Sequence, residues 1–459
     1  MKHSSILYIV ALSVLSSCMA PKYEVPHHPM PEKFKNQSRA SRCEPMGQWW
    51  EQFNDPILNA LIKQALKSNY ELRIALEKIE ESREFYNQRR ANLFPVINIG
   101  SDVSRVRVSK ALDITATLPT ISSFYSLGLD SFWELDVWGK LRNAKNAQYY
   151  LFQAQVENMR DIYIMLIAQV AREYILATAF ANRICILKNR IAIDSGTLTL
   201  LKDLFHAGLV SQISVAQQEQ VLATSQDLLK ASQTDLIQSK NQIALLLGVN
   251  PEAITIPLAK RVPLSHVRVA TGIPSDLIRR RPDIRQVERE LASSNESVGQ
   301  AIAEWFPSFC LLGGMSSESS KGSSWFTGKS LAWNIGPSIQ WPLINFGRIK
   351  ANIKAKESVK RQTALRYSQA IIRALKEVED FLAAYFNTLT QYDIVERQLQ
   401  QAQLQEQLIK AQYESGLASY ETLLSAQKNT VNTELVCIQV QQNMSENVVS
   451  LYKALGGGW

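Results

Sequence analysis

Two stretches of the chain carry a helical pattern over an unusual length. Gly139 and Gly208 enclose the first stretch, Gly347 and Gly416 enclose the second, and Ala, Leu, Gln, Lys and Glu are abundant in both. Apart from Gly196, neither stretch contains a Gly or a Pro. Residues of these types lose little rotamer freedom in a helix. We therefore predict two very long helices, each roughly 100 Å at about 1.5 Å per residue.

Shorter helical patterns precede both long ones. Asp55 is placed to cap the first, which has Pro56 in its first turn and apolar residues at helical spacing through about Arg90. The second runs from about Ser275 to Ala303, and Arg281-Pro282 would form or kink its start. Each long helix is thus expected to follow a shorter one.

Between the short and the long helical patterns, the period changes to two. Apolar residues alternate with mostly polar ones over residues 126–137 and 331–343. This spacing predicts strands that have one apolar and one polar face. Residues 96–108 and 309–316 are the other strand candidates, and the register of the first is uncertain because its alternation changes phase around Arg105.

The whole order of patterns occurs twice. Three glycines recur at a constant displacement of 208 positions, the pairs being Gly139 and Gly347, Gly208 and Gly416, and Gly248 and Gly456. Phe94-Pro95 and Phe306-Pro307, which precede the strands, are displaced by 212 positions. The four-residue difference falls in the strand region, where loops tolerate it. We predict a tandem repeat whose two halves pack on each other.

The amino terminus resembles a bacterial lipoprotein signal. Lys2 and His3 precede the apolar run 6–12, which is too short for a transmembrane helix and is followed by small residues and Cys18. In such signals the thiol carries a diacylglycerol and the new amino terminus an acyl chain. The alternative is an ordinary signal peptide in which Cys18 is incidental. Met19 follows, so no acidic residue there would hold a lipoprotein at the inner membrane.

These observations predict the domain organisation. Pro21, Pro26, Pro29 and Pro31, which follow soon after Cys18, favour an extended strap. The expected parts are a signal peptide (1–17), a lipid-anchored strap (18–54), a first repeat (55–248), a linker (249–273) and a second repeat (274–459).

Composition argues against several function classes. The formal charge is +8, but Lys and Arg are scattered singly among polar residues, which favours solvated helix faces over a nucleic-acid surface. The five histidines show no HExxH spacing and no GxSxG element is present, so we expect neither an enzyme nor a metal site. The final glycines, 456–458, lack the Lys and Ser or Thr of a phosphate loop. No cofactor is expected beyond the lipid on Cys18.

The remaining cysteines are far apart in the sequence. Cys43, Cys185, Cys310 and Cys437 form no CxxC motif. They are interpreted as buried or free thiols, and a bridge between Cys185 and Cys437 would require their two helices to lie side by side.

The number of strands limits the architecture. Strands that span a membrane need about 9–11 residues and must belong to a closed barrel, because lipid cannot satisfy an open edge. About eight strands are the fewest seen in such barrels, whereas one chain supplies four. The barrel must therefore be shared: two chains would supply eight strands and three would supply twelve, enough for a water channel.

Several motifs carry a family likeness. They are the lipobox at Cys18, Trp49-Trp50, Asp55-Pro56, Arg281-Pro282-Asp283-Ile284, Phe306-Pro307, Asn345-Phe346-Gly347-Arg348 and the closing residues 452–459. Together they resemble the outer-membrane efflux lipoproteins of the TolC superfamily, over nearly the whole chain. The resemblance implies a mainly α fold with a transmembrane β part. Three chains would form a 12-stranded β-barrel, and their coiled-coil hairpins would continue it as a periplasmic α-helical barrel.

The resemblance also implies a function. The chain would be the homotrimeric exit duct of a tripartite efflux pump in the outer membrane of a Gram-negative-type cell. Its partners would be a periplasmic adaptor and an inner-membrane transporter of the RND or ABC type, and its cargo small molecules such as drugs or toxic compounds.

The family's tip motif occurs once in each half. Gly208-Leu209 and Gly416-Leu417 match it, which implies that these residues lie at the periplasmic tips and contact the adaptor. A glycine suits a turn between helices and the close approach of a partner.

The candidate gate departs from the family pattern. Many relatives carry an Asp three residues after the second tip glycine, whereas this chain has Ser419 there and Ser211 in the first half. Glu421 or Glu414 could supply a charge nearby, but either is equally explained as a solvated helix residue.

Two alternatives stay open. The duct could belong to a type I protein secretion system, which shares the fold and differs in its partner. The chain could instead be a lipid-anchored periplasmic coiled-coil scaffold without a pore, since long helices alone fit an inert rod. The four predicted strands argue against the scaffold.

Overall fold

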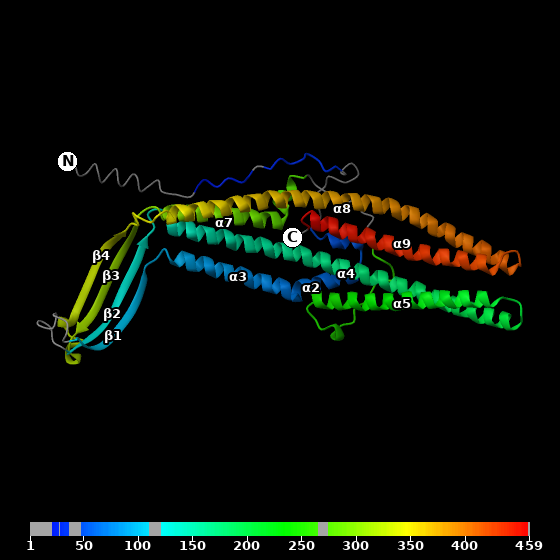
Figure 1. The fold of residues 1–459 in the computed structure, drawn as a ribbon, viewed down its shortest axis with the longest axis horizontal. Helices are drawn as coiled ribbons and strands as arrows, with labels where there is room; N and C mark the ends of the chain where they lie inside the picture. Colours follow the sequence, from blue (N-terminus) through cyan, green and yellow to red (C-terminus); the bar gives the residue numbers. More distant parts are fainter. Residues whose placement is uncertain (1–20, 27, 36–46, 110–120, 265–273, 458–459) are drawn as a thin grey trace. The chain divides into compact units, whose positions relative to one another are not determined.

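We determined the fold from a computed structural model, which describes residues 21–26, 28–35, 47–109, 121–264 and 274–457. The signal peptide, Cys18, Cys43, His27 and His266 lie outside the described residues. In chain order the elements are η2 (Trp49–Phe53), α2 (Pro56–Ser68), α3 (Tyr70–Ala91), β1 (Val96–Arg107), β2 (Ile121–Leu135), α4 (Lys140–His206), α5 (Gln212–Leu246), η4 (Pro251–Ala253), α6 (Asp276–Arg280), α7 (Pro282–Ala303), β3 (Ser308–Ser319), η5 (Gly322–Ser324), η6 (Gly328–Ser330), β4 (Leu331–Gln340), α8 (Arg348–Glu414) and α9 (Tyr420–Ala454) (Figure 1).

The tandem repeat is confirmed by the lengths of its helices. Helices α4 and α8 each contain 67 residues, and the helices that follow them, α5 and α9, each contain 35. All six glycines of the repeat have a positive φ, between 67° and 85°. Residues with a Cβ avoid this region, so the glycines mark the points where the backbone must leave a helix or enter one.

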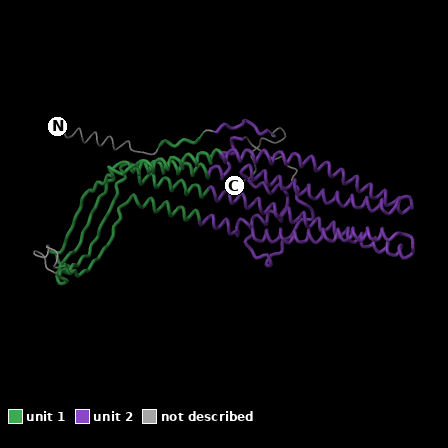
Figure 2. The backbone as a smooth tube through the Cα atoms, in the orientation of Figure 1, with its two compact units in different colours: residues 1–27, 78–156, 286–368 green, residues 28–77, 157–285, 369–459 purple. Residues whose placement is uncertain are grey.

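The two repeats do not coincide with the two compact units of the structure. The first unit comprises residues 1–27, 78–156 and 286–368, and the second comprises residues 28–77, 157–285 and 369–459 (Figure 2). Each unit therefore takes segments from both repeats. The first unit holds the strands, and the second holds both helical turns at Gly208 and Gly416.

The helix expected from Asp55 to about Arg90 is interrupted. Asp55 caps α2 as predicted, accepting hydrogen bonds from the amides of Ile57 (2.8 Å) and Leu58 (3.2 Å). The prediction of one continuous helix was wrong, because α2 ends at Ser68 and α3 begins at Tyr70. Asn69 lies between them: its Oδ1 accepts from the Leu72 amide (3.0 Å) and its Nδ2 donates to the Leu246 carbonyl (2.8 Å). The break predicted at Arg281 is confirmed, since α6 ends at Arg280 and α7 begins at Pro282.

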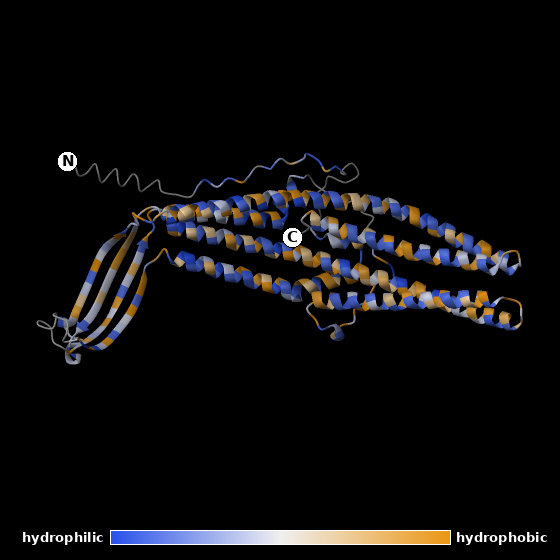
Figure 3. Ribbon diagram, in the orientation of Figure 1, coloured by the Kyte–Doolittle hydropathy of each residue, from blue (hydrophilic) through white to orange (hydrophobic). Residues whose placement is uncertain are grey.

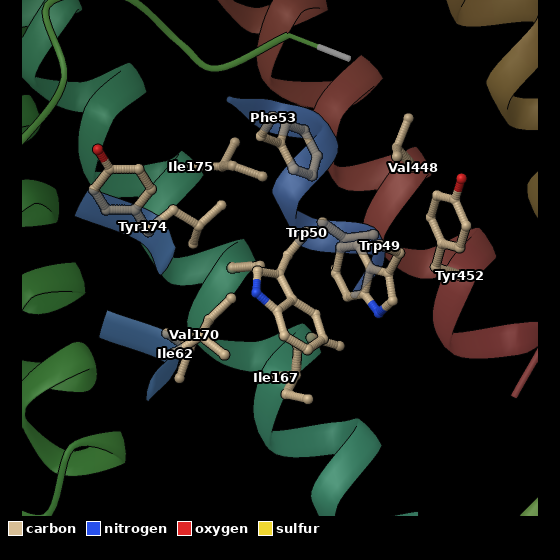
Figure 4. Close-up of a cluster of buried hydrophobic side chains, with 14 of the residues drawn as sticks. Trp49, Trp50, Phe53, Ile62, Ile167, Val170, Tyr174, Ile175, Val448 and Tyr452 are labelled. Carbon is tan, nitrogen blue, oxygen red and sulfur yellow. The ribbon is translucent and has the colours of Figure 1, made fainter. Parts of the chain in front are cut away.

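The core of the second unit is built around the short helix η2. Trp49, Trp50 and Phe53 are all buried, among side chains of α2, α4 and α9 (Figure 4). Trp49 stacks on Tyr452 with 5.4 Å between ring centroids and meets Trp50 edge to face at 5.9 Å. Burial of large side chains of this kind contributes about 1.5–3 kcal/mol each, so η2 joins the surrounding helices.

The motifs at Arg281 and at the carboxyl end meet in the same unit. The Arg281 guanidinium donates to Asp283 (2.7 Å and 3.0 Å), to Glu377 (2.8 Å) and to the Ala454 carbonyl (3.0 Å). Burial of Arg281 lowers its pKa, but the bonds to both carboxylates outweigh this and raise it. A Cβ on Gly456 would lie 3.2 Å from the Arg280 carbonyl carbon. These motifs therefore have a structural role, closing α9 against α7 and α8.

Candidate functional site: an amphipathic sheet and two helical tips

The strands of the described chain form one antiparallel sheet in the order β1-β2-β3-β4. Its registers place the apolar sides of all four strands on one face. Ile99 lies opposite Leu129, Leu129 opposite Met315, and Met315 opposite Trp333. All four side chains are exposed. Figure 3 shows hydrophobic and hydrophilic residues following one another along the strands. The exposed apolar row predicts contact with a solvent other than water.

The opposite face of the sheet is polar and contains small residues. Asn98 lies opposite Asp130, Asp130 opposite Gly314, and Gly314 opposite Asn334. Asn98 Nδ2 donates to Asp130 Oδ2 at 2.9 Å. A Cβ on Gly314 would lie 2.5 Å from Asn334 Oδ1, so the side chains on this face are crowded. The glycine therefore leaves room for the Asn334 side chain on this face.

The register of β1, which the sequence left uncertain, is regular. Every residue from Val96 to Arg107 pairs with β2 without interruption, from Val96 opposite Phe132 to Arg107 opposite Ile121. Arg105 and Arg107 therefore share a face with Ile97 and Val103. The change of phase in the sequence marks the end of the apolar band and does not mark a bulge.

Three tryptophans form hydrogen bonds at the end of the sheet where the strands connect to the helices, which we call the base of the sheet. Trp133 Nε1 donates to the Leu93 carbonyl (2.9 Å), and Trp341 Nε1 donates to the Trp305 carbonyl (3.2 Å). These are the same bond in the two repeats, since the donors differ by 208 positions and the acceptors by 212. Trp138 Nε1 donates to the Pro307 carbonyl (2.8 Å). Each bond ties the end of a strand, or the residues after it, to the turn that precedes another strand.

The two predicted tips have the same backbone geometry. Gly208 has φ +76° and Gly416 has φ +72°. The Leu209 amide donates to the Leu204 carbonyl (2.9 Å), and the Leu417 amide donates to the Gln412 carbonyl (2.8 Å). With the bonds from Gly208 to Phe205 and from Gly416 to Tyr413, these complete two Schellman caps. Leu209 and Leu417 are largely exposed, so each tip presents one leucine to solvent.

The candidate gate residues lie just after the tips. Ser211 and Ser419 are the N-cap residues of α5 and α9, and Ser419 Oγ accepts from the Thr422 amide (3.3 Å). Glu421 and Glu414 are exposed. Because an N-cap prefers Ser and Asp about equally, Ser419 can serve the helix start without adding a charge.

A buried polar network near the tips was not predicted. Arg190 and Asp194 form an ion pair (2.8 Å) with side chains 5% and 0% exposed. Gln218 Nε2 donates to the Asp194 carbonyl (2.9 Å), and Tyr420 Oη donates to Gln218 Oε1 (2.8 Å). Burial, then the charge of Asp194, raises the pKa of Tyr420 to about 12. The network joins α4 and α5 to α9; the only sequence signal was a four-residue spacing, which is also common on helix surfaces.

The described cysteines form no pair with one another. Cys185 is exposed, Cys310 is partly buried and Cys437 is buried, and each is a free thiol.

Comparison with known proteins assigns the family. The sequence profile described as "Outer membrane efflux protein" matches the chain twice, over residues 61–249 and 273–457. The chain belongs to the outer membrane efflux protein family. The double match follows the tandem repeat, and the mainly helical fold with a small antiparallel sheet confirms the predicted fold class.

Relatives cover this efflux protein from end to end. "Probable outer membrane lipoprotein SilC" of Salmonella typhimurium is 29% identical over 99% of this chain and 98% of its own length. "Solvent efflux pump outer membrane protein SrpC" of Pseudomonas putida is 30% identical over the same shares. The crystal structure of CusC, a protein called a cation efflux system protein in Escherichia coli (strain K12), superposes with a TM-score of 0.86. It is 29% identical and covers 96% of this chain and 99% of its own.

The membrane-facing element of this efflux protein is its sheet. One described helix, α4, has an 18-residue window apolar enough to cross a membrane, but 61% of that window is buried inside the protein. Burial of this kind is typical of a core helix. The exposed apolar face of the sheet instead fits the outer membrane that the family name indicates.

Proposed function

We propose that three copies of the chain form the outer-membrane duct of a tripartite efflux pump. The observation that carries this proposal is a four-stranded amphipathic sheet whose apolar face is exposed and whose β1 and β4 edges are open. An open edge cannot persist in lipid, so the sheet must be closed by other copies. Three copies supply twelve strands, with the polar face turned to a water-filled lumen.

The partners follow from the two tips. A periplasmic adaptor docks at Gly208-Leu209 and Gly416-Leu417, and an inner-membrane transporter of the RND or ABC type delivers the cargo to the duct. The exposed leucines offer the adaptor an apolar contact beside each turn. Small molecules are the proposed cargo class. The relatives' names differ between solvents and cations, which agrees with selection by the transporter instead of the duct.

The lipid anchor is proposed to be Cys18, with a diacylglycerol on its thiol and an acyl chain on its amino group. The name of SilC includes the word lipoprotein, which supports this assignment. Replacing Cys18 by Ser should abolish labelling by a radioactive fatty acid. Labelling that persists in that variant would contradict the assignment.

Conductance and oligomeric state test the duct directly. Purified protein should migrate as a trimer on a gel without boiling, dissociate on heating, and open channels in a planar bilayer. A scaffold without a pore would give no conductance, whatever its oligomeric state. Co-purification separates the two kinds of pump, because a type I secretion system would bring down an ABC transporter dedicated to a protein substrate.

A further inference from the structure

The two repeats are joined by an aromatic contact at the base of the sheet. Trp138, which follows β2, stacks on Phe306 with 4.9 Å between ring centroids and an interplanar angle of 26°. Its ring centroid is 6.5 Å from that of Phe309, and its indole donates to the Pro307 carbonyl. The residues after the first hairpin are thereby fixed to the residues before the second.

The strand registers show that the repeat applies to the sheet residue by residue. Val96 lies opposite Phe132 in the first hairpin, and Ser308 lies opposite Gln340 in the second. These pairs are related by displacements of 212 for the first strand of a hairpin and 208 for the second strand. The same displacements relate Trp138 to Phe346, Phe306 to Phe94 and Phe309 to Ile97.

The equivalents of the joined residues are exposed. Phe346 is 99% exposed, Phe94 60% and Ile97 67%. Phe346 also has φ +48°, a region in which aromatic residues are uncommon. This backbone conformation is strained, and it presents an aromatic ring to solvent. Such strain is offset when the ring contacts a partner outside the described chain. Phe346 follows the edge strand β4, whereas Phe94 precedes the opposite edge strand, β1, and Ile97 lies at its start.

We propose that Phe346 of one copy packs against Phe94 and Ile97 of a second copy, repeating between chains the contact that Trp138 makes within one. The proposal rests on the shared barrel proposed above. It also specifies the register between copies: because Asp130 lies opposite Gly314, Ser338 of β4 lies opposite Asp102 of the second copy's β1. The partner is thus an identical chain, and Phe346 is the residue that selects its position.

Disulfide cross-linking tests the register. In a Cys310→Ser background, which removes the native thiol that lies opposite Ser338 in the same chain, the double variant Ser338→Cys with Asp102→Cys should form covalent dimers and trimers in outer membranes under mild oxidation. The matched control, Ser338→Cys with Val103→Cys, moves one thiol to the other face of the sheet and should form at least about tenfold less, since neighbouring strand residues point to opposite faces. Single variants report the background from native cysteines. Equal cross-linking of both double variants, or none in the first, overturns the register.

Phenylalanine truncation tests the aromatic contact. Phe346→Ala should speed dissociation of the trimer in detergent by about 2- to 10-fold per interface, as expected for loss of an aromatic pair. Phe94→Ala should do the same, and the double variant should be no worse than either single one. Phe326→Ala, which removes another exposed phenylalanine in the β3–β4 loop, is the control and should have no effect.

The outcomes separate this inference from the proposed duct. A wild-type protein that forms neither trimers nor channels would overturn the duct itself. A wild-type trimer that conducts, combined with fully additive effects of Phe346→Ala and Phe94→Ala, would overturn the aromatic contact alone.

Discussion

At the residue scale, the buried pair of Arg190 and Asp194 shows how charges are held inside the helical unit. Asp194 is fully buried, and its carboxylate is bonded to Arg190 and lies 3.4 Å from Ser225 Oγ. Gln218 connects the same aspartate to Tyr420 on α9. A charge without its partner would be costly here, so the network depends on all of its members.

Removing one partner of this pair should therefore destabilise the protein. Asp194→Ala leaves the Arg190 guanidinium buried without a counter-charge, and we expect a loss of about 3–5 kcal/mol. Thermal unfolding followed by helical circular dichroism measures the change. Glu357→Ala, which removes an exposed helix ion pair, is the control and should leave the melting temperature unchanged. Similar melting temperatures for both variants would contradict the prediction that the buried ion pair contributes more to stability than the exposed one.

The pKa of Tyr420 predicts a dependence on alkaline pH. Because its pKa is raised from 10.0 to about 12, the unfolded chain releases the phenolic proton at a lower pH than the folded protein does. The stabilising contribution of Tyr420 is thus complete below pH 10 and is lost as the pH rises to about 12. Ultraviolet titration of tyrosinate should show that Tyr420→Phe removes a group titrating near pH 12. Loss of a group titrating near 10 would show that the Tyr420 hydroxyl is fully solvated in solution.

At the element scale, the same capping motif ends four helices. Helices α4, α5, α8 and α9 each finish in a Schellman cap with a glycine of positive φ. The surroundings of these glycines differ. A Cβ would meet nothing within 4 Å at Gly208 or Gly416, but at Gly248 it would lie 2.5 Å from the Ser68 carbonyl oxygen. The turns at Gly208 and Gly416 therefore have room for a side chain, and the helix cap at Gly248 does not.

Alanine substitutions should distinguish the two kinds of cap. Gly208→Ala adds only the backbone strain of a left-handed residue, about 1 kcal/mol. Gly248→Ala adds a clash with backbone to that strain and should lower the melting temperature clearly more. Equal shifts for the two variants would show that the chain near Ser68 moves aside at no cost.

Larger side chains at the tips should affect docking rather than folding. Gly416→Trp fills the open space beside Leu417, so we expect reduced cross-linking to the adaptor and increased drug susceptibility while the trimer persists. Gly196→Trp places the same bulk on α4, where a Cβ also meets nothing within 4 Å, and serves as the control. Unchanged cross-linking and susceptibility in Gly416→Trp would contradict the assignment of this turn to the adaptor site.

At the scale of the whole molecule, the sheet makes the single chain incomplete. Its apolar face and both edge strands need partners that the described chain does not supply. The helices bury a core within one copy around Trp49 and Tyr452, but they also expose large apolar side chains such as Leu245, Leu365 and Leu408. Assembly is therefore expected to involve both the strands and the helices.

Placing a charge on one face or the other of β4 tests how the two faces of the sheet are assigned. Ile335→Arg places a guanidinium on the apolar face, at a cost of about 2–4 kcal/mol near the bilayer midplane. Asn334→Arg places it on the polar face of the same strand, toward the lumen. Outer-membrane fractionation should show strongly reduced assembly for Ile335→Arg and normal assembly for Asn334→Arg. The reverse result would mean that the faces are assigned the wrong way round.

Much of the fold was predictable because its signals are local. The long helices, the alternating strands and the six glycines follow from spacing and residue type along the chain. The break at Asn69 was missed because the carbonyl it binds, that of Leu246, lies 177 positions away. The tip leucines were found through the family motif, whereas the link from Gln218 to Tyr420 joins residues 202 positions apart that carry no motif.

The sequence by itself determined which segments are helix and which are strand, that they occur twice, and that each strand has an apolar face, because these properties depend on near neighbours. Tertiary structure alone decided that the four apolar faces coincide, that Arg190 and Asp194 are buried, and that Trp138 is partly buried while Phe346 is exposed. Strand register and burial depend on contacts between residues far apart in the chain. The spacing of residues within one segment carries no information about these contacts.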